Sequence, residues 1–596
     1  MATPKGKDVY QCYFATSADN PNLHKCRECL REIKQIIPKG YANLVSHVTS
    51  QHKDDYLEKL RTFAGNVIGG MDNFVRKVST DAKDIYGWMD WIVVENLALR
   101  SCEKERFRRW SNLGIISVRR LKRFMKLTKK VVFERIKKRA PKTYGLIIDG
   151  WSIGSDHYYA IFITWSNEDT GAVEEYLIYF GVAEDINEET EFVEGLGSEH
   201  KKFGFTAADW FDIICLALND LFENTTEETM INVDNFKKIV EFISADNCPT
   251  NVKLCNEAET NMKGCDSHKL HLAVVEMCGP EEKRNRAGDV SQVASHLQVT
   301  ISKVDHCMKD LGQPKNAALL RTKTRLRPEK RIKIRWSSLF SVLKKWLRIR
   351  RSVSSVTSWP AEFLDLIPTA LDNRMIDEHI RKLRNFESVS KKLQSSGDKR
   401  LNIYQSRVLL DKLIVDYGDE FPLTALKRDA KIVQNKHFES GIFKIQGGLE
   451  STLTRAEEKA VEIFLKQPAS LSNNQRGETA YADAILEDAA DQKRRRTSAS
   501  KYRCTNHISP TTNIVERANS HAKLNITDKR SHMHPETLQL IMILKLNKSL
   551  WPSELTIQEM LDKIQEQSES EDVDQDDDDE DGEDDDEDDE DEEEED

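Results

Sequence analysis

The stretch TYGLIIDGWSIGSDHYYAIFITWSNEDTGAVEEYLIYFGV, residues 143–182, decides what kind of fold this chain adopts. It contains three short runs rich in β-branched and aromatic residues, at 143–148, 158–165 and 174–182. Polar turns, such as GSD at 154–156, separate the runs. Three such runs in succession predict the strands of an antiparallel meander.

The segments that follow extend this pattern into a mixed α/β layer. Residues 207–222 predict a helix and 239–244 predict a further strand, which gives the order βββαβ. We therefore expect the first part of an α/β core at 141–290. Residues 291–502 predict a mostly helical insertion, and 503–555 return to short apolar segments that end the core.

The segment before the sheet, 59–140, predicts a basic helical region for DNA binding or oligomerisation. Its clearest helix is 117–140, which Ser117 can cap and Pro141 ends. The apolar residues recurring there at spacings of three, four and seven are Val118, Leu121, Met125, Val132 and Ile136. Residues 100–142 carry 17 basic and 3 acidic residues. A solvated helical face and contact with the DNA backbone both explain this charge.

The net charge of −12 conceals two regions of opposite sign. Residues 566–596 contain 25 Asp or Glu and no Lys or Arg. Without them 75 acidic residues face 88 basic ones, a charge of about +13, which is typical of a phosphate binder. We expect 556–596 to be a disordered acidic tail. It could bind histones or other basic proteins, compete with DNA for the basic body, or confer solubility.

The sequence also indicates in which cellular compartment the protein is found. The chain has 596 residues, enough for three or four domains. The opening residues MATPKGKDVY lack an apolar signal-peptide core, and no apolar run approaches the ~20 residues that span a bilayer. We therefore expect no membrane partner and reduced thiols at the eleven cysteines. The KRRR cluster at 493–496 indicates either a nuclear import signal or a solvated loop, and we expect the nucleus.

Residues 1–58 contain a Cys/His set with the spacing of a zinc finger. Cys26 and Cys29 form a C-x2-C pair, and His47 and His52 follow 17 residues later, about one helical turn apart. Two thiolates and two imidazoles are a tetrahedral ligand set for structural Zn²⁺. A domain this small needs its metal to fold.

The 17-residue gap exceeds the roughly 12 residues of the common C2H2 finger. The finger instead resembles the BED type, in which aromatic residues precede the first cysteine and an N-L-x-x-H segment carries the first histidine. Tyr10, Tyr13 and Phe14 match the aromatic positions, and residues 43–47 (NLVSH) match the helix. The resemblance implies a module that binds double-stranded DNA.

Two aspartates follow predicted strands, Asp149 after TYGLII and Asp246 after EFISA. Carboxylates at the ends of neighbouring strands can share Mg²⁺ ions, which prefer oxygen ligands. Two such ions activate the attacking oxygen and stabilise the leaving oxygen of a phosphodiester. Taken alone, each aspartate is better explained by a turn or cap role, which is common for Asp at the end of a strand.

Six segments in order resemble the hAT superfamily of DNA transposases. They are DGWS at 149–152, HYYAIF at 157–162, ADNCPTN at 245–251, CDSHKL at 265–270, RWSS at 335–338, and SPTTNIVER at 509–517 with the following 535–551. Together with the finger they run from residue 10 to about 551. The resemblance implies a ribonuclease-H-like domain interrupted by a large helical insertion, with hAT dimerisation residues in 503–555 and hence a homo-oligomer.

The resemblance also implies a D-D-E triad of Asp149, Asp246 and Glu516 that holds catalytic Mg²⁺ or Mn²⁺. Without it, a helix salt bridge from Glu516 to Arg517 or Lys523 is the simpler interpretation. One residue departs from the family pattern E-R-x-F-S, because Asn519 replaces the aromatic residue.

Three further residues are expected to contact DNA: Arg335, Trp336 and His268. Trp336 matches an aromatic residue that stacks on a base, a contact worth ~1–3 kcal/mol. A core tryptophan packed with Leu339, Leu343 and Trp346 explains the same pattern. His268 belongs with Cys265 to a C-x-x-H element, whose alternative is ordinary packing.

Three functions remain open from the sequence. The first is a transposase that cuts and joins phosphodiesters by a two-metal D-D-E mechanism. The second is a domesticated, non-catalytic DNA-binding regulator in the nucleus or chromatin. The third is a histone-binding chromatin protein in which the acidic tail matters most.

Overall fold

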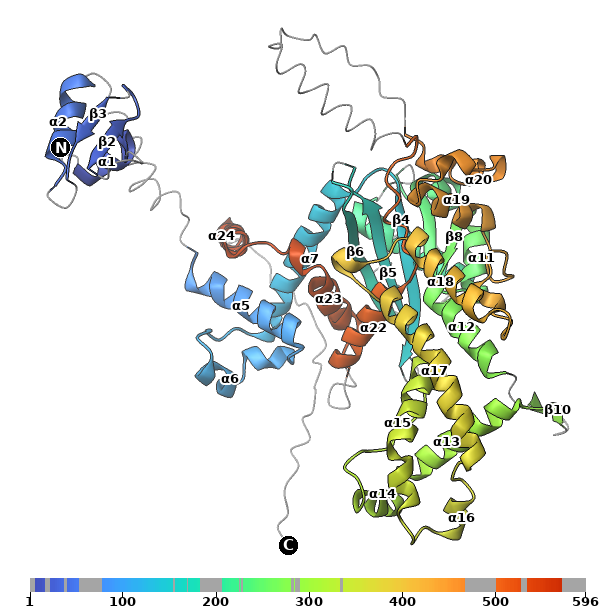
Figure 1. The fold of residues 1–596 in the computed structure, drawn as a ribbon. Helices are drawn as coiled ribbons and strands as arrows, with labels where there is room; N and C mark the ends of the chain where they lie inside the picture. Colours follow the sequence, from blue (N-terminus) through green and yellow to red (C-terminus); the bar gives the residue numbers. More distant parts are fainter. Residues whose placement is uncertain are drawn as a thin grey trace, which may run out of the picture. The chain divides into compact units, whose positions relative to one another are not determined.

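The structure is a computed structural model that describes residues 6–16, 22–29, 31–36, 40–52, 78–153, 156–168, 170–182, 206–224, 226, 229–279, 283–284, 290–332, 336–466, 500–526 and 533–570. The chain divides into two compact units. Figure 1 labels their helices and strands. The first comprises Met1–Ile92, Ala98–Phe124 and Pro552–Glu583, and the second comprises Val93–Leu97, Met125–Trp551 and Asp584–Asp596. Each unit is described by itself.

The second unit is built on a five-stranded sheet with the order β6-β5-β4-β7-β8. Its strands are β4 (Tyr144–Ile153), β5 (Asp156–Ser166), β6 (Val173–Val182), β7 (Val240–Ala245) and β8 (Asn261–Gly264). The three strands expected from 143–182 form the antiparallel meander, in which Gly145 pairs with Thr164 and Thr164 with Glu175. The mixed α/β class expected from the sequence is therefore confirmed.

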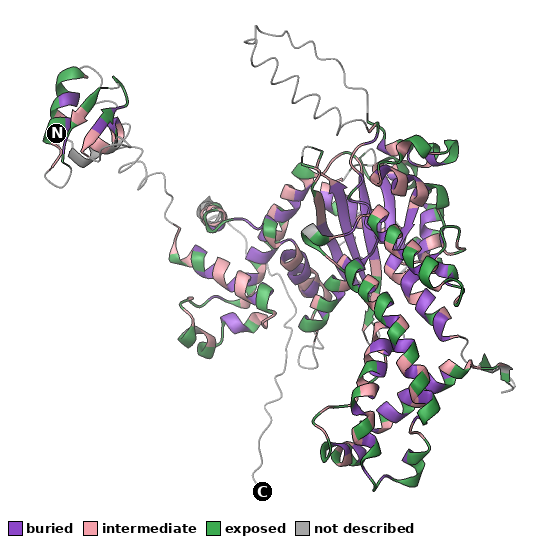
Figure 2. Ribbon diagram, in the orientation of Figure 1, coloured by how far each residue is buried: buried purple, intermediate pink, exposed green. Residues whose placement is uncertain are grey.

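β7 and β8 join the meander by parallel pairing, β7 to β4 and β8 to β7. Parallel neighbours need a crossover connection, and α9 (Ala207–Phe222) and α10 (Val233–Ile239) lie between β6 and β7 in the chain. The strands are buried along most of their length, as Figure 2 shows. Gly145 allows this packing, because a Cβ there would lie 2.1 Å from the ring of Phe242.

Helices from distant parts of the chain pack on the sheet. α22 (Asn513–Asn525) contacts β4 and β5, and α23 (Pro535–Leu546) contacts β6. α11 (Pro249–Glu257) contacts β8 and α9. The segment after 503 thus returns to the sheet across the intervening helices.

The insertion between β8 and α22 is mostly helical in the residues that the structure describes. Its helices are α12 (Asp266–Cys278), α13 (His296–Asp310), α14 (Pro314–Arg321), α15 (Trp336–Ser354), α16 (Ala361–Leu364), α17 (Ala370–Leu393), α18 (Ile403–Tyr417), α19 (Lys436–Gln446) and α20 (Arg455–Ala460). A two-stranded sheet pairs β9 (Lys283–Arg284) with β10 (Val290–Gln292). Val304, Leu343, Ile349 and Leu383 lie in one core cluster that joins several of these helices.

Short 3₁₀ helices connect the longer elements. They are Leu99–Cys102, Gly397–Lys399, Thr424–Leu426, Glu450–Thr452, Glu462–Phe464 and Lys548–Leu550.

The basic helix expected at 117–140 is present as α7 (Val118–Arg139). The Ser117 Oγ accepts a hydrogen bond from the Arg120 N–H at 3.2 Å, so Ser117 caps the helix as expected. Leu121, Met125, Val132 and Ile136 are buried. Before it lie α5 (Thr80–Glu95) and α6 (Glu105–Trp110).

The acidic tail was expected to begin at 556, but α24 (Glu554–Ser570) continues as a helix past that point. Ile557 and Leu561, four residues apart, are buried, and the Gln558 side chain accepts a hydrogen bond from the Ser79 N–H at 2.9 Å. This apolar stripe makes the start of the predicted tail helical. Residues 571–596 lie outside the described residues, as does the basic cluster at 493–496.

Candidate functional site

The N-terminal residues fold around three short strands. β1 (Phe14–Thr16), β2 (Leu23–Cys26) and β3 (Glu32–Lys34) form an antiparallel sheet that accompanies α1 (Gly6–Tyr13) and α2 (Ala42–Gln51). Cys26 ends β2, and Cys29 lies in the turn that follows. His47 lies on α2 and His52 directly follows it. The strand, the turn and the helix therefore each contribute to one site.

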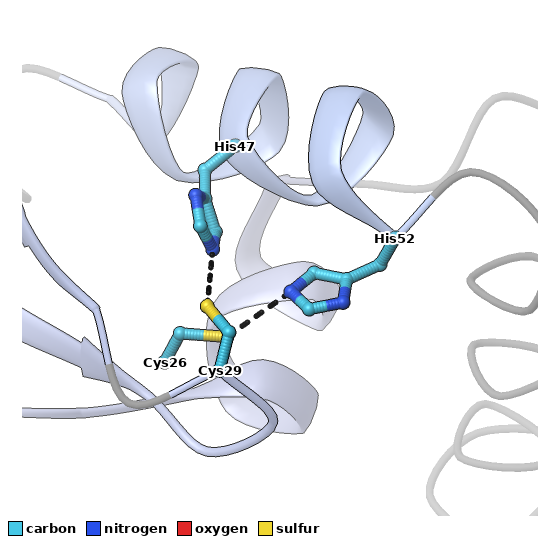
Figure 3. A group of neighbouring side chains, drawn as sticks. All are labelled: Cys26, Cys29, His47 and His52. Atoms are coloured by element: carbon cyan, nitrogen blue, oxygen red, sulfur yellow. Dashed lines mark hydrogen bonds between the residues drawn. The ribbon is translucent and has the colours of Figure 1, made fainter.

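The four Cys/His side chains converge as their spacing predicts (Figure 3). Their ligand atoms all lie within 4.8 Å of one another. The Cys29 Sγ is 3.3 Å from His47 Nε2, and the Cys26 Sγ is 3.5 Å from His52 Nε2. A tetrahedral Zn²⁺ with bonds of about 2.3 Å to sulfur and about 2.0 Å to nitrogen separates those atoms by roughly 3.5 Å. The cluster could therefore bind a metal such as zinc.

Burial shifts the pKa values of two of these side chains, His47 and Cys26, in opposite directions. Burial lowers the pKa of the His47 imidazole, and the charges of His52 and Arg31 lower it further. His47 is thereby kept in the neutral form that binds metal. Burial raises the pKa of the Cys26 thiol, so a metal must displace its proton.

The residues of the BED-like pattern have structural roles around the site. The Tyr13 ring stacks on His52, and Phe14 meets His47 edge-on, each with a centroid separation of 5.8 Å. The Asn43 side chain donates to the Lys34 carbonyl at 2.9 Å, which attaches α2 to β3. Leu44, three residues before His47, is fully buried. The contacts with Tyr13 and Phe14 and the hydrogen bond of Asn43 thus keep both histidines oriented toward the cysteines.

The second candidate site involves the neighbouring parallel strands β4 and β7. β4 and β7 are in register with Ile147 opposite Ser244. Asp149 follows Ile147 by two residues, and Asp246 follows Ser244 by two residues. β4 extends to Ile153, so Asp149 lies inside a strand and not at its end as expected; there it pairs with Ala160 of β5. Parallel register nonetheless brings the two aspartates to neighbouring positions.

Asp246 is held by the motif that follows it. The buried Asn251 side chain of α11 donates to Asp246 Oδ1 at 2.6 Å and to the Asp246 carbonyl at 3.2 Å. Pro249 occupies the first turn of α11, where its missing N–H costs nothing. Gly264 leaves room for Asn247, since a Cβ there would lie 1.9 Å from Asn247 Oδ1.

Glu516 lies in the first turn of α22, which packs on β4 and β5. The segment before it is attached to the start of α12: the Asp266 N–H donates to the Pro510 carbonyl at 2.9 Å and the Thr512 N–H to Cys265 Sγ at 3.5 Å. Burial raises the pKa of the Cys265 thiol, and the charge of Glu516 adds to this effect. Cys265 is therefore a packing residue close to Glu516.

The salt bridge from Glu516 to Arg517 or Lys523 is absent from the described residues, and Glu516 is half-buried. Asn519 on the same helix is buried, and its Oδ1 has no hydrogen-bond partner. Within the described part of the chain, the four finger residues form the only group of three or more potential ligands within 4.8 Å of one another. The three carboxylates are therefore more widely spaced than the finger ligands.

The three expected DNA-contacting residues fall in different surroundings. Trp336 begins α15 and is only 7% exposed; it belongs to one core cluster with Leu339, Leu343 and Trp346. His268 on α12 is half-buried, with its ring centroid 6.2 Å from that of His271. Arg335 lies outside the described residues.

Sequence reasoning missed two buried charge networks that position these elements. In the first, Glu241 of β7 binds His507 Nε2 at 3.0 Å and the Arg503 guanidinium at 2.6 Å. In the second, Lys269 binds Glu439 at 2.8 Å and Asp266 at 3.3 Å. Asp266 and Lys269 were visible in CDSHKL, but their distant partner Glu439 had no sequence signal.

The chain matches no protein-family model and none of the curated proteins with which it was compared. Among the described residues, no helix is long and apolar enough to span a membrane.

Proposed function

We propose that this chain is a DNA-binding protein of the hAT transposase type, which cuts and joins phosphodiesters through Asp149, Asp246 and Glu516. The observation that carries the proposal is the parallel register of β4 and β7, which gives the two aspartates neighbouring positions. α22, the helix that bears Glu516, packs on β4 itself. Three acids from distant parts of the chain thus belong to the sheet and to a helix that packs on it.

A ribonuclease-H-like core is part of this proposal. It is supported by the order of elements: a three-stranded meander, a helical crossover, two parallel strands, and a C-terminal helix that returns to the sheet. The long helical segment between β8 and α22 corresponds to the implied insertion.

Three carboxylates are a fitting donor set for Mg²⁺ or Mn²⁺, which when bound would polarise the phosphodiester and activate the attacking oxygen. The residues of this chain orient the donors. Asn251 fixes the Asp246 carboxylate through Oδ1. Asp149 is half-buried inside β4, so the sheet limits its movement.

The finger has a separate role in the proposal. Its zinc would be structural, because all four ligand positions belong to protein side chains and none is open to substrate. The finger would bring the carboxylate site to particular double-stranded DNA ends. We also propose nuclear localisation, a homo-oligomer formed through 503–555, and histone binding by the tail, which deletion of residues 566–596 would test.

The deciding experiment is a strand-cleavage assay with Mg²⁺. Its substrates are duplexes that carry the ends of the transposable element that such a transposase would excise. We expect wild type to cleave and Asp149→Ala to lose activity. Asp156→Ala, at the start of the neighbouring strand, is the matched control and should cleave normally. Equal cleavage by wild type and Asp149→Ala would exclude the triad.

A second candidate is a non-catalytic descendant that only binds DNA. It is favoured by the wider spacing of the three carboxylates and by Asn519, a buried polar residue at the aromatic position of the family pattern. Duplex binding without cleavage by any variant, in Mg²⁺ or Mn²⁺, would support this candidate over the enzyme.

A further inference from the structure

An exposed tryptophan stands in a basic part of the first unit. Trp110, the last residue of α6, is 82% exposed, and Ile115 in the following loop is 61% exposed. Tryptophan is highly buried on average, so a tryptophan with this exposure is unusual. The Arg109 guanidinium lies 5.7 Å from the centroid of the Trp110 ring.

The backbone around Trp110 is held by an aromatic cluster that includes the buried Trp88. Phe107, on the same helix, meets Trp91 of α5 edge-on at 5.8 Å, and Trp91 stacks on Trp88. The Trp88 indole N–H donates to the Gly114 carbonyl at 2.7 Å, which fixes the loop after α6. A Cβ on Gly114 would lie 2.5 Å from the Asp84 carboxylate, so that loop packs closely on α5. Trp110 is therefore presented by a fixed scaffold.

The charge around this aromatic residue is strongly positive. Residues 100–123 contain nine Lys or Arg and two Asp or Glu. Arg106 and Arg109 are exposed, and neither forms an ion pair with any residue that the structure describes. Glu103, one of the two acids, accepts a hydrogen bond from the Val118 N–H at 2.6 Å and so serves the entry of α7.

We propose that Trp110 stacks on a base of bound DNA while Arg106 and Arg109 contact the adjacent phosphates. This second DNA contact rests on the proposed DNA-binding function and is independent of the finger. An aromatic face beside unpaired guanidinium groups is the combination that binds unstacked bases. We name the exposed residues Arg106, Arg109, Trp110 and Ile115 the α6 surface; Figure 2 colours most of α6 as exposed.

A lipid bilayer fits the α6 surface less well than DNA. Binding in a membrane interface needs a helix with a long apolar face, and α6 has six residues. Its one long apolar residue besides Trp110, Phe107, packs inward on Trp91.

The test measures binding of the full chain to a fluorescein-labelled duplex with a single-stranded extension, by anisotropy, at several salt concentrations. Trp110→Ala should weaken binding by about 5- to 150-fold, the range for loss of one stacked base. Its salt dependence should stay unchanged, whereas Arg109→Gln should lower the salt slope by about 1. Trp110→Phe should retain most of the affinity. Val415→Ala, at another exposed apolar residue, is the matched control.

The outcomes separate this proposal from the proposed function. If wild type binds DNA and Trp110→Ala binds equally well with intact folding, the α6 surface is not a DNA contact, while the finger-based function stands. The same measurement with the finger disabled by Cys29→Ser should keep the Trp110 effect. If wild type binds no DNA, both proposals fail. Binding to anionic phospholipid vesicles, or self-association lost in Trp110→Ala, without any effect on DNA binding would overturn the DNA assignment.

Discussion

The finger and the carboxylate site are two candidate metal sites that the chain assembles over different distances. The finger draws its ligands from residues 26–52, and its turn, strand and helix already hold them within 4.8 Å. The carboxylates come from β4, the residue after β7 and α22, and their relative placement depends on strand register and on the packing of α22 on β4. A local motif specifies its own geometry, whereas the distant acids depend on the packing of the whole second unit.

The largest effect that tests this difference is removal of the metal. Adding a strong chelator should unfold residues 6–52 and leave β4–β8 unchanged, because zinc supplies on the order of 10–16 kcal/mol of the folding free energy of such fingers. Amide hydrogen exchange reports both regions at once. Cys26→Ser should act like the chelator, and Cys12→Ser, outside the ligand cluster, should not. If the amides of the finger stay protected from exchange after chelation, the finger does not depend on a metal for its fold.

The next largest effect tests the contacts between distant segments of the second unit. Lys269→Ala should destabilise the second unit by about 3 kcal/mol, because Asp266 and Glu439 lose one of the two buried lysines that pair with them and keep only Lys263. Urea unfolding followed by hydrogen exchange in β8 and α19 measures the loss. Lys253→Ala removes an exposed pair on α11 and should cost below about 0.5 kcal/mol. A loss confined to α12 would show that the network does not connect distant segments.

The same network predicts an acid dependence. Burial by itself would raise the pKa of Asp266, but the charges of Lys263 and Lys269 outweigh it and hold the pKa well below the ordinary value of 3.8. The carboxylate therefore stabilises the fold fully above that value, and the contribution disappears as the pH falls below it. Stability of the second unit, measured from pH 7 to pH 2, should fall below about pH 4, and Asp266→Asn should flatten that fall.

A smaller effect concerns positioning of the carboxylate itself. Asn251→Ala should lower cleavage by about 10- to 100-fold, because Asp246 loses the amide that orients it. Asn256→Ala, at an exposed position of the same helix, is the matched control. Unchanged cleavage with Asn251→Ala would mean that the backbone alone orients Asp246.

The smallest effect tests the departure at Asn519. Asn519→Leu should stabilise the second unit by ~1 kcal/mol, because it removes a buried amide oxygen without a partner. Thermal unfolding measures the gain. Ser520→Ala, exposed on the same helix, should change little. A loss of stability in Asn519→Leu would show that the Asn519 amide stabilises the packing of α22, and that an apolar side chain does not fit in its place.

The elements with strong local patterns were predicted well. The three β-branched and aromatic runs in 143–182 predicted the meander, and the apolar spacing in 117–140 predicted α7 with its Ser117 cap. The C-x2-C and H-x4-H spacings predicted a cluster that could bind zinc. Each of these depends on residues close in sequence. The helical extension at 554–570 was missed, because the dense acidic run that follows obscured the pair Ile557 and Leu561.

The sequence by itself determined the local units of this protein: the finger ligands, the strands of the meander, the basic helix and the opposite charges of body and tail. Only the tertiary structure decided that β7 lies beside β4 in a register that pairs Ile147 with Ser244, two residues before Asp149 and Asp246. It also decided that Glu439 partners Lys269, and that Trp110 is exposed while Trp336 is buried. The physical reason is range. Hydrophobic periodicity and ligand spacing act within a few turns of chain, whereas strand register, buried ion pairs and the exposure of one aromatic side chain depend on which distant surfaces pack together.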